Sequence, residues 1–241
     1  MPNDKGEVVS LSGSPIHYYD KPAGWEAPQG EMCLEQISTH IEAHLGPVAT
    51  VFHEIISDTV HIDVHVVLAT EQSPYVRLVT SGMSDLAMPV GDNDVPRYLE
   101  LVATLPGDWK LDQASFEDER WYWPVRLLKQ LARFPHKYRT WLGWGHSMPN
   151  GDPPEPYAPN TTLCGVVLLP SVTVPEAFAT LQIDAEKEVH FLSLVPLYRE
   201  EMDLKLRKGT DALLERFDKQ GVDDTIDPRR INTARKRFGF F

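Results

Sequence analysis

The stretch TVHIDVHVV, residues 59–67, decides the fold, because its side chains alternate between apolar and polar from Val60 to Val66. The apolar positions are Val60, Ile62, Val64 and Val66, and the polar positions between them are His61, Asp63 and His65. Alternation with a period of two residues is typical of a β-strand that buries one face. Residues two apart on a strand lie on the same face, about 6.6 Å from one another. We therefore expect two imidazoles and one carboxylate to share the face that points away from the apolar core.

Strand patterns continue on both sides of this stretch. Further segments rich in β-branched and apolar residues lie at 49–56, 75–82, 97–105, 163–170 and 188–198. The first four strands along the chain follow one another closely, which favours a largely antiparallel sheet. Turn-forming residues such as Ser57 and Asp58 separate them.

Three helical patterns accompany the strands. They cover 31–47, 121–135 and 199–221. Gly46 and Pro47 end the first helix, Pro124 suits the first turn of the second, and Pro135 is expected to end the second. No Pro/Gly-rich linker separates two bodies. The prediction is one mixed α/β (α+β) domain over 31–241, with a central, mostly antiparallel sheet flanked by helices and an extended N-terminal arm at 1–30.

Charge and composition restrict the partners. The 241-residue chain has 23 Lys and Arg against 35 Asp and Glu, a net charge of −12. Such a protein repels phosphate backbones, so no nucleic-acid partner is expected, and a basic protein partner is favoured. No segment reads as a signal peptide or as a membrane span, and Cys33 and Cys164 make no disulfide framework. The expectation is a cytoplasmic protein with reduced thiols.

The polar face of residues 59–67 allows two interpretations. Two histidines on one strand can bind one metal ion, with Asp63 as a ligand or as a group that orients an imidazole. His53 and the later His146 could complete such a site. The protein would then be a metal-dependent hydrolase that uses His61, Asp63, His65 and His146. A half-buried sheet with hydrogen-bonded histidines gives the same pattern, and we favour this interpretation, with no metal and no cofactor.

Other enzymatic chemistry has no motif in the chain. There is no G-x-S-x-G elbow, no P-loop and no G-x-G-x-x-G after a strand. Both cysteines fall in apolar patterns typical of core positions. The sequence therefore predicts a protein that is not an enzyme.

Aromatic residues concentrate between positions 121 and 144. Seven of the 24 residues there carry aromatic rings: Trp121, Tyr122, Trp123, Phe134, Tyr138, Trp141 and Trp144. One helix and one loop rarely bury so many rings, and Trp and Tyr anchor protein interfaces. Some of these rings are therefore expected to bind a partner.

Five segments in order along the chain resemble the suppressor-of-fused domain family. They are VTSGMSDLAM (79–88), YLELVATLPGDW (98–109), WPVRLLKQLARFP (123–135), TWLGWGHSMPNG (140–151) and FLSLVPLYREEMDLKL (191–206). The resemblance extends over roughly residues 32–235, and the chain looks like a bacterial stand-alone form. It implies a sheet flanked by helices and a non-enzymatic role in protein binding. Bacterial members include immunity proteins that neutralise toxins, so the resemblance also suggests a toxin as the basic partner.

The resemblance also points to a binding surface at the end of the second helix. The peptide contacts of the animal protein fall here at Phe134, Trp141 and Gly145, where Gly145 replaces an acidic residue of the animal form. The predicted binding residues, named the aromatic surface below, are Phe134, Tyr138, Trp141, Trp144, Gly145 and His146. We expect a protein or peptide partner to dock there.

Overall fold

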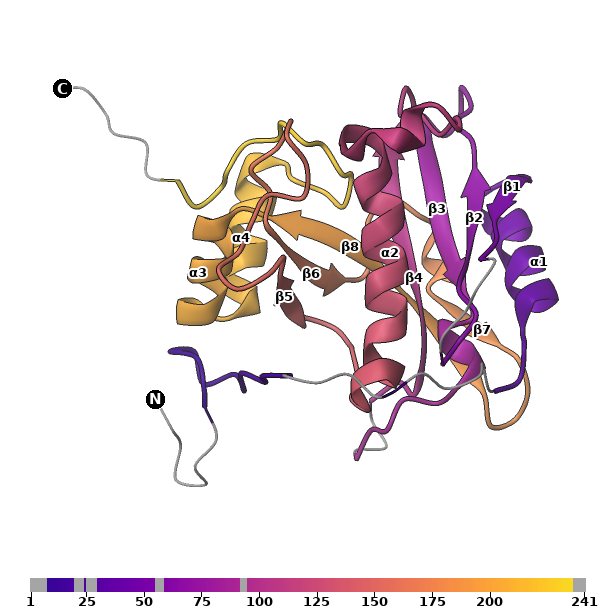
Figure 1. Ribbon diagram of the computed structural model, residues 1–241, viewed down its shortest axis with the longest axis horizontal. Helices are drawn as coiled ribbons and strands as arrows, with labels where there is room; N and C mark the ends of the chain where they lie inside the picture. Colours follow the sequence, from indigo (N-terminus) through magenta and orange to yellow (C-terminus); the bar gives the residue numbers. More distant parts are fainter. Residues whose placement is uncertain (1–7, 20–23, 25–29, 55–58, 92–94, 236–241) are drawn as a thin grey trace.

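The second half of the alternating stretch forms a strand in the computed structural model, within an antiparallel meander (Figure 1). The structure describes residues 8–19, 24, 30–54, 59–91 and 95–235. Strand β2 (Asp63–Val67) pairs antiparallel with β1 (Val48–Phe52) and with β3 (Tyr75–Ser81). The predicted strand at 49–56 thus ends earlier, and positions 55 and 56 lie outside the described residues.

The remaining strands extend this meander into one sheet. They are β4 (Tyr98–Pro106), β5 (Ser147–Pro149), β6 (Gly165–Leu169), β7 (Thr180–Gln182) and β8 (Glu188–Leu197). Their order is β1-β2-β3-β4-β8-β6-β5, with β7 paired to β8. Among the described strands, β4 and β8 are parallel, and every other pair is antiparallel. The predicted fold class, a single domain with a mostly antiparallel central sheet, is confirmed.

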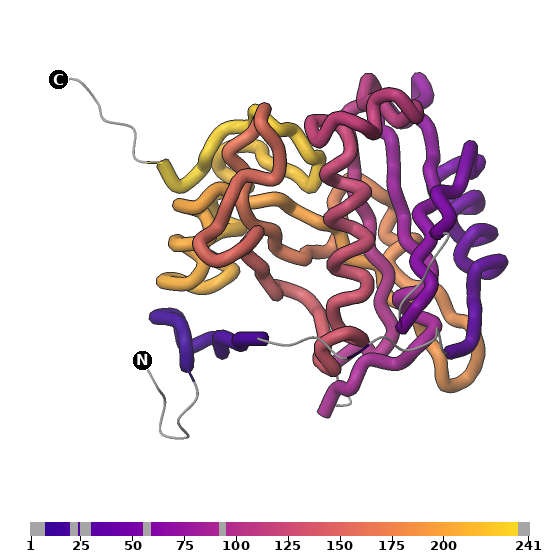
Figure 2. The backbone as a smooth tube through the Cα atoms, in the orientation of Figure 1, coloured from indigo at the N-terminus to yellow at the C-terminus, as the bar shows by residue number. Residues whose placement is uncertain are grey.

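Helices cover both faces of the sheet. The described helices are α1 (Leu34–His44), α2 (Glu119–Tyr138), α3 (Arg199–Lys208) and α4 (Thr210–Gln220), with short 3₁₀ turns η1 (Met83–Asp85), η2 (Ser115–Glu117) and η3 (Glu176–Phe178). Val66 and Leu78 share a core with α2, whereas their neighbours Val67 and Val79 pack with α1. Successive strand residues point to opposite faces, so α2 and α1 lie on opposite sides (Figure 2).

Helix α2 is longer at both ends than its sequence pattern predicts. It begins at Glu119, because the Asp118 side chain accepts a hydrogen bond from the Arg120 N–H at 2.9 Å and caps the first turn. The prediction that Pro135 ends the helix was wrong. A proline removes one backbone donor, but the buried His136 ring binds the Met83 carbonyl at 2.8 Å and holds the last turn in place.

A third hydrophobic core lies under α3 and α4. Leu213 and Phe217 pack there against β6 and β8. A buried ion pair joins α3 to the segment that follows α4. The Glu201 side chain is fully buried, and Arg230 donates to both of its carboxylate oxygens at 2.8 and 2.5 Å.

Among the described residues no helix has the length and apolar character needed to cross a membrane. Cys33 and Cys164 are buried free thiols.

The GMSDL turn (82–86) directly follows β3 and requires a glycine at position 82. Gly82 has φ of 104°, and a Cβ there would lie 1.8 Å from the His61 carbonyl oxygen. The turn also places Ser84 against Glu100, whose carboxylate accepts from the Ser84 N–H at 2.8 Å and from the Ser84 hydroxyl at 2.6 Å. Glu100 is fully buried, and burial raises its pKa from 4.5 to about 7. A titrating carboxyl group is therefore part of the core.

Glu100→Gln is expected to flatten the pH dependence of stability. The raised pKa means that the folded state favours the neutral Glu100 carboxyl. The contribution of this group to the free energy of unfolding is therefore fully present below about pH 4.5 and is lost as the pH rises to about 7. The loss amounts to about 3 kcal/mol in the wild type. Urea unfolding at pH 5 and pH 8 measures it. The exposed Glu186→Gln should keep the wild-type profile, and a Glu100→Gln profile parallel to the wild type would contradict this expectation.

Candidate functional site

The aromatic surface lies where α2 ends and the chain turns toward β5. Arg139 adopts a left-handed conformation with φ of 52°, and the Thr140 N–H returns to the Pro135 carbonyl at 2.8 Å. The backbone then reaches β5 through Gly145, whose φ is 73°. A Cβ on Gly145 would lie 3.2 Å from the Thr210 hydroxyl oxygen. The tight turn thus explains a glycine at this position without any role in binding.

Phe134 and Tyr138 are partly covered by a residue from the N-terminal arm. Their own rings are 4.7 Å apart. The Tyr19 ring packs edge-on against Phe134, with centroids 5.2 Å apart, and lies 5.4 Å from Tyr138. The Tyr19 hydroxyl also shares a 2.7 Å hydrogen bond with the Thr140 hydroxyl. These two predicted residues therefore contact the chain's own arm.

Trp141 and His146 form the inner part of the surface. Their rings lie 4.3 Å apart, and Trp141 also packs against the core beneath α2. Burial, together with the neighbouring Lys205 and His17, lowers the pKa of His146 to about 4. His146 is consequently neutral near pH 7, so it adds no positive charge to the surface. Both side chains are half-buried, so each exposes only part of its ring to solvent.

Trp144 is the member of the surface that projects into solvent. Its exposed fraction is 53%. It follows the buried Leu142 by two residues and precedes Gly145, whose N–H donates to the Leu168 carbonyl at 2.8 Å. The hydrogen-bonded turn therefore holds a large apolar ring outward. An exposed ring on a rigid turn fits the anchor of a protein interface.

Strand β5 continues from this turn at an edge of the sheet. It pairs with β6 and with no other described strand. Pro149 sits on β5, in agreement with the confinement of proline to edge strands. Within the described residues no strand pairs with the second edge of β5, so this edge is open to pairing with an extended peptide, a short distance along the chain from Trp144.

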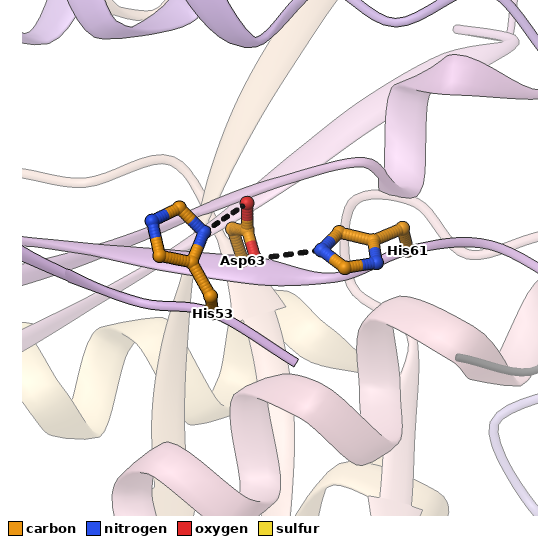
Figure 3. A group of neighbouring side chains, drawn as sticks. All are labelled: His53, His61 and Asp63. Atoms are coloured by element: carbon orange, nitrogen blue, oxygen red, sulfur yellow. Dashed lines mark hydrogen bonds and ion pairs between the residues drawn. The ribbon is translucent and has the colours of Figure 1, made fainter. Parts of the chain in front are cut away.

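Around the polar face of β2, two histidine rings point toward the Asp63 carboxylate (Figure 3). Asp63 is buried and accepts hydrogen bonds from the His53 ring at 2.9 Å and from the His61 ring at 3.0 Å. Its carboxylate also accepts from the Glu54 N–H at 3.4 Å. These three donors account for the buried carboxylate, as the structural interpretation predicted.

The four residues of the metal-dependent hydrolase do not converge. Within the described part of the chain, the residues close enough to share an ion are His53, His61 and Asp63. His65 is instead buried between the sheet and its α1-side cover, where its ring binds the Ser81 hydroxyl at 2.9 Å and burial lowers its pKa. The expectation that this histidine faces away from the core was therefore wrong, and His146 belongs to the aromatic surface.

Tyr19 and Thr140 are contact residues that the sequence analysis missed. The available signal was weak: a pair of tyrosines, Tyr18 and Tyr19, in an arm that also holds scattered apolar residues such as Leu11 and Ile16. Nothing local links Tyr19 to Phe134, because 115 positions separate them in the chain.

Comparisons with known proteins agree with this architecture. A family model described as Suppressor of fused protein (SUFU) matches residues 58–231. A SUFU homologue from Neisseria gonorrhoeae FA 1090 shares 14% identity with a TM-score of 0.61, and the match covers 84% of this chain and 97% of that chain. A chain of the Sufu–Fu complex shares 14% identity with a TM-score of 0.58, and the match covers 85% of this chain and 93% of that chain.

A third structure shares the fold over a longer protein. Drosophila Suppressor of Fused shares 12% identity with a TM-score of 0.55, and the match covers 90% of this chain but 54% of that chain. No curated protein matches the sequence. At these identities the solved structures show a common fold and carry no residue-level assignment.

Proposed function

Because this chain belongs to the suppressor of fused family, we propose that it is a non-enzymatic protein-binding domain whose partner docks on the aromatic surface. The observation that carries the proposal is Trp144, a large apolar ring that is 53% exposed on a rigid turn beside an edge strand. A peptide could pair with β5 while placing an apolar side chain against Trp144. No metal or cofactor is part of this proposal.

The charge of the protein supports a basic partner. The net charge of −12 would speed encounter with a basic protein and disfavour nucleic acid. A toxin that attacks nucleic acid has the matching positive charge, and neutralising it would need tight binding without catalysis. We infer that the protein acts as a cytoplasmic immunity protein of this kind.

Co-expression tests the immunity role. The toxin candidate is the product of a gene adjacent to the one that encodes this chain, expressed in bacterial cells with and without the protein. We expect the protein to restore growth and to elute with the toxin in size-exclusion chromatography. A complex without protection would support protein binding but contradict neutralisation. Neither a complex nor protection would contradict the proposed partner class.

A further inference from the structure

The N-terminal arm forms its own small hairpin. The Ser10 N–H donates to the Ser14 carbonyl at 2.8 Å, and the Ile16 N–H donates to the Val8 carbonyl at 2.9 Å. Gly13, with φ of 86°, lies in the turn between them. Residues 8–16 of the arm therefore form a hydrogen-bonded hairpin.

One end of the hairpin docks on the C-terminal end of α3. The Ser12 N–H donates to the Leu206 carbonyl at 3.0 Å, and the Ser12 hydroxyl donates to the Lys205 carbonyl at 3.4 Å. Carbonyls in the last turn of a helix lack the usual partner within the helix, so the Leu206 carbonyl readily accepts an incoming donor. The Lys205 carbonyl also accepts from the Gly209 N–H at 2.8 Å, so the Ser12 hydroxyl adds a second, longer bond there.

The other end of the arm reaches the aromatic surface. Tyr19 packs on Phe134 and Tyr138 and bonds to Thr140, as described above. His17 lies near enough to His146 to help lower that residue's pKa. Figure 1 shows the described part of the arm below α3 and β5, directed toward the lower end of α2. The arm therefore passes along the surface that the proposed function assigns to a partner.

The contacts are few enough to be reversible. An edge-on ring pair and single hydrogen bonds, such as those made by Tyr19 and Ser12, each contribute only modestly to stability. Much of the arm's apolar surface stays in solvent, since Leu11 is 72% and Tyr18 is 70% exposed. An element held in this way can be displaced by a ligand that makes the same contacts and adds others.

We propose that residues 8–19 are an intramolecular ligand of the aromatic surface, and that a partner binds by displacing Tyr19 with an aromatic side chain of its own. This inference rests on the proposed function for the identity of the surface. It adds the chemistry of the partner: an extended segment with an aromatic residue, preferably tyrosine, whose ring fits against Phe134 and whose hydroxyl can reach Thr140. Because the arm and the partner occupy the same surface, the arm also lowers the apparent affinity of the protein for its partner.

The test uses a probe that needs no identified partner. A fluorescein-labelled peptide of residues 8–19, VVSLSGSPIHYY, is titrated into full-length protein and followed by fluorescence anisotropy. The wild-type surface is occupied by a tethered arm at an effective concentration of order mM, so it should bind the peptide weakly. The double variant Ser12→Pro/Tyr19→Ala loses both docking points and should bind the peptide at least about tenfold more tightly. A peptide carrying Tyr19→Ala should bind neither protein.

The controls separate this proposal from a structural role of the arm. Tyr18→Ala changes the neighbouring exposed tyrosine and should leave peptide binding at the wild-type level. Equal peptide affinity for the wild type and the double variant would overturn the proposal. So would a large fall in melting temperature for Tyr19→Ala but not Tyr18→Ala, or a wild-type dimer that Tyr19→Ala dissociates. Failure of the toxin assay with a positive peptide result would contradict the partner class alone.

Discussion

Arg230→Ala is expected to lower the free energy of unfolding by about 3–5 kcal/mol, because it leaves a buried charge without its counter-ion. Glu201 has no solvent exposure, and Arg230 binds both of its oxygens. The Arg230 guanidinium also donates to the Pro196 carbonyl at 2.7 Å and lies 4.9 Å from the centre of the Tyr198 ring. Alanine removes all of these contacts at once. Urea unfolding followed by circular dichroism measures the loss.

The neighbouring residue provides a matched control. Arg229 is exposed, and Arg229→Ala should change stability by no more than about 0.5 kcal/mol. Arg230→Lys should recover only part of the lost stability, since an ammonium group cannot bind both carboxylate oxygens in the planar geometry of guanidinium. Equal urea midpoints for Arg229→Ala and Arg230→Ala would show that the ion pair does not hold this segment.

Trp144→Ala is expected to weaken partner binding by more than tenfold, or about 2 kcal/mol, without lowering the melting temperature. The indole is the exposed ring of the proposed binding surface, so on this proposal its removal deletes contact area with a partner but little packing within the fold. Isothermal titration calorimetry with the toxin identified by co-expression gives the affinity, and a thermal melt of the same sample gives the stability.

A second exposed apolar residue makes this result specific. Val172 is 75% exposed in the segment after β6, and Val172→Ala should leave both affinity and stability unchanged. If Trp144→Ala binds the partner as well as the wild type, the partner docks elsewhere. If Trp144→Ala melts far lower, the ring supports the turn and is not an anchor.

The sheet was predictable from the sequence because its signals are local. The alternation at Val60–Val66 contains β2, which begins only at Asp63, and the β-branched residues of β3 and β4 mark those strands. Short connections between β2, β3 and β4 leave little choice of neighbour within the meander. The start of α2 was less predictable. Asp118 lies in a run of charged residues, and its role as a helix cap depends on backbone geometry that the composition does not reveal.

The burial of His65 and the docking of Tyr19 depend on contacts between distant segments. Period-two patterning shows that His65 shares a face with Asp63, but it cannot show that α1 covers that face. In the same way, the six predicted residues of the aromatic surface form one stretch of chain, whereas the arm that partly covers them comes from the other end of the sequence. Long-range packing decides both outcomes.

The parallel pairing of β4 with β8 has a consequence for synthesis on the ribosome. Strands β1 to β4 form a local meander that can assemble as soon as it emerges, but the partner of β4 begins about 80 residues later. At about 5–20 residues per second, the nascent chain carries an unpaired β4 edge for about 4–16 s. During that interval an apolar strand, Tyr98–Pro106, is open to pairing with other chains. Translation speed across α2 and β6 therefore sets how long the half-built sheet needs protection from aggregation.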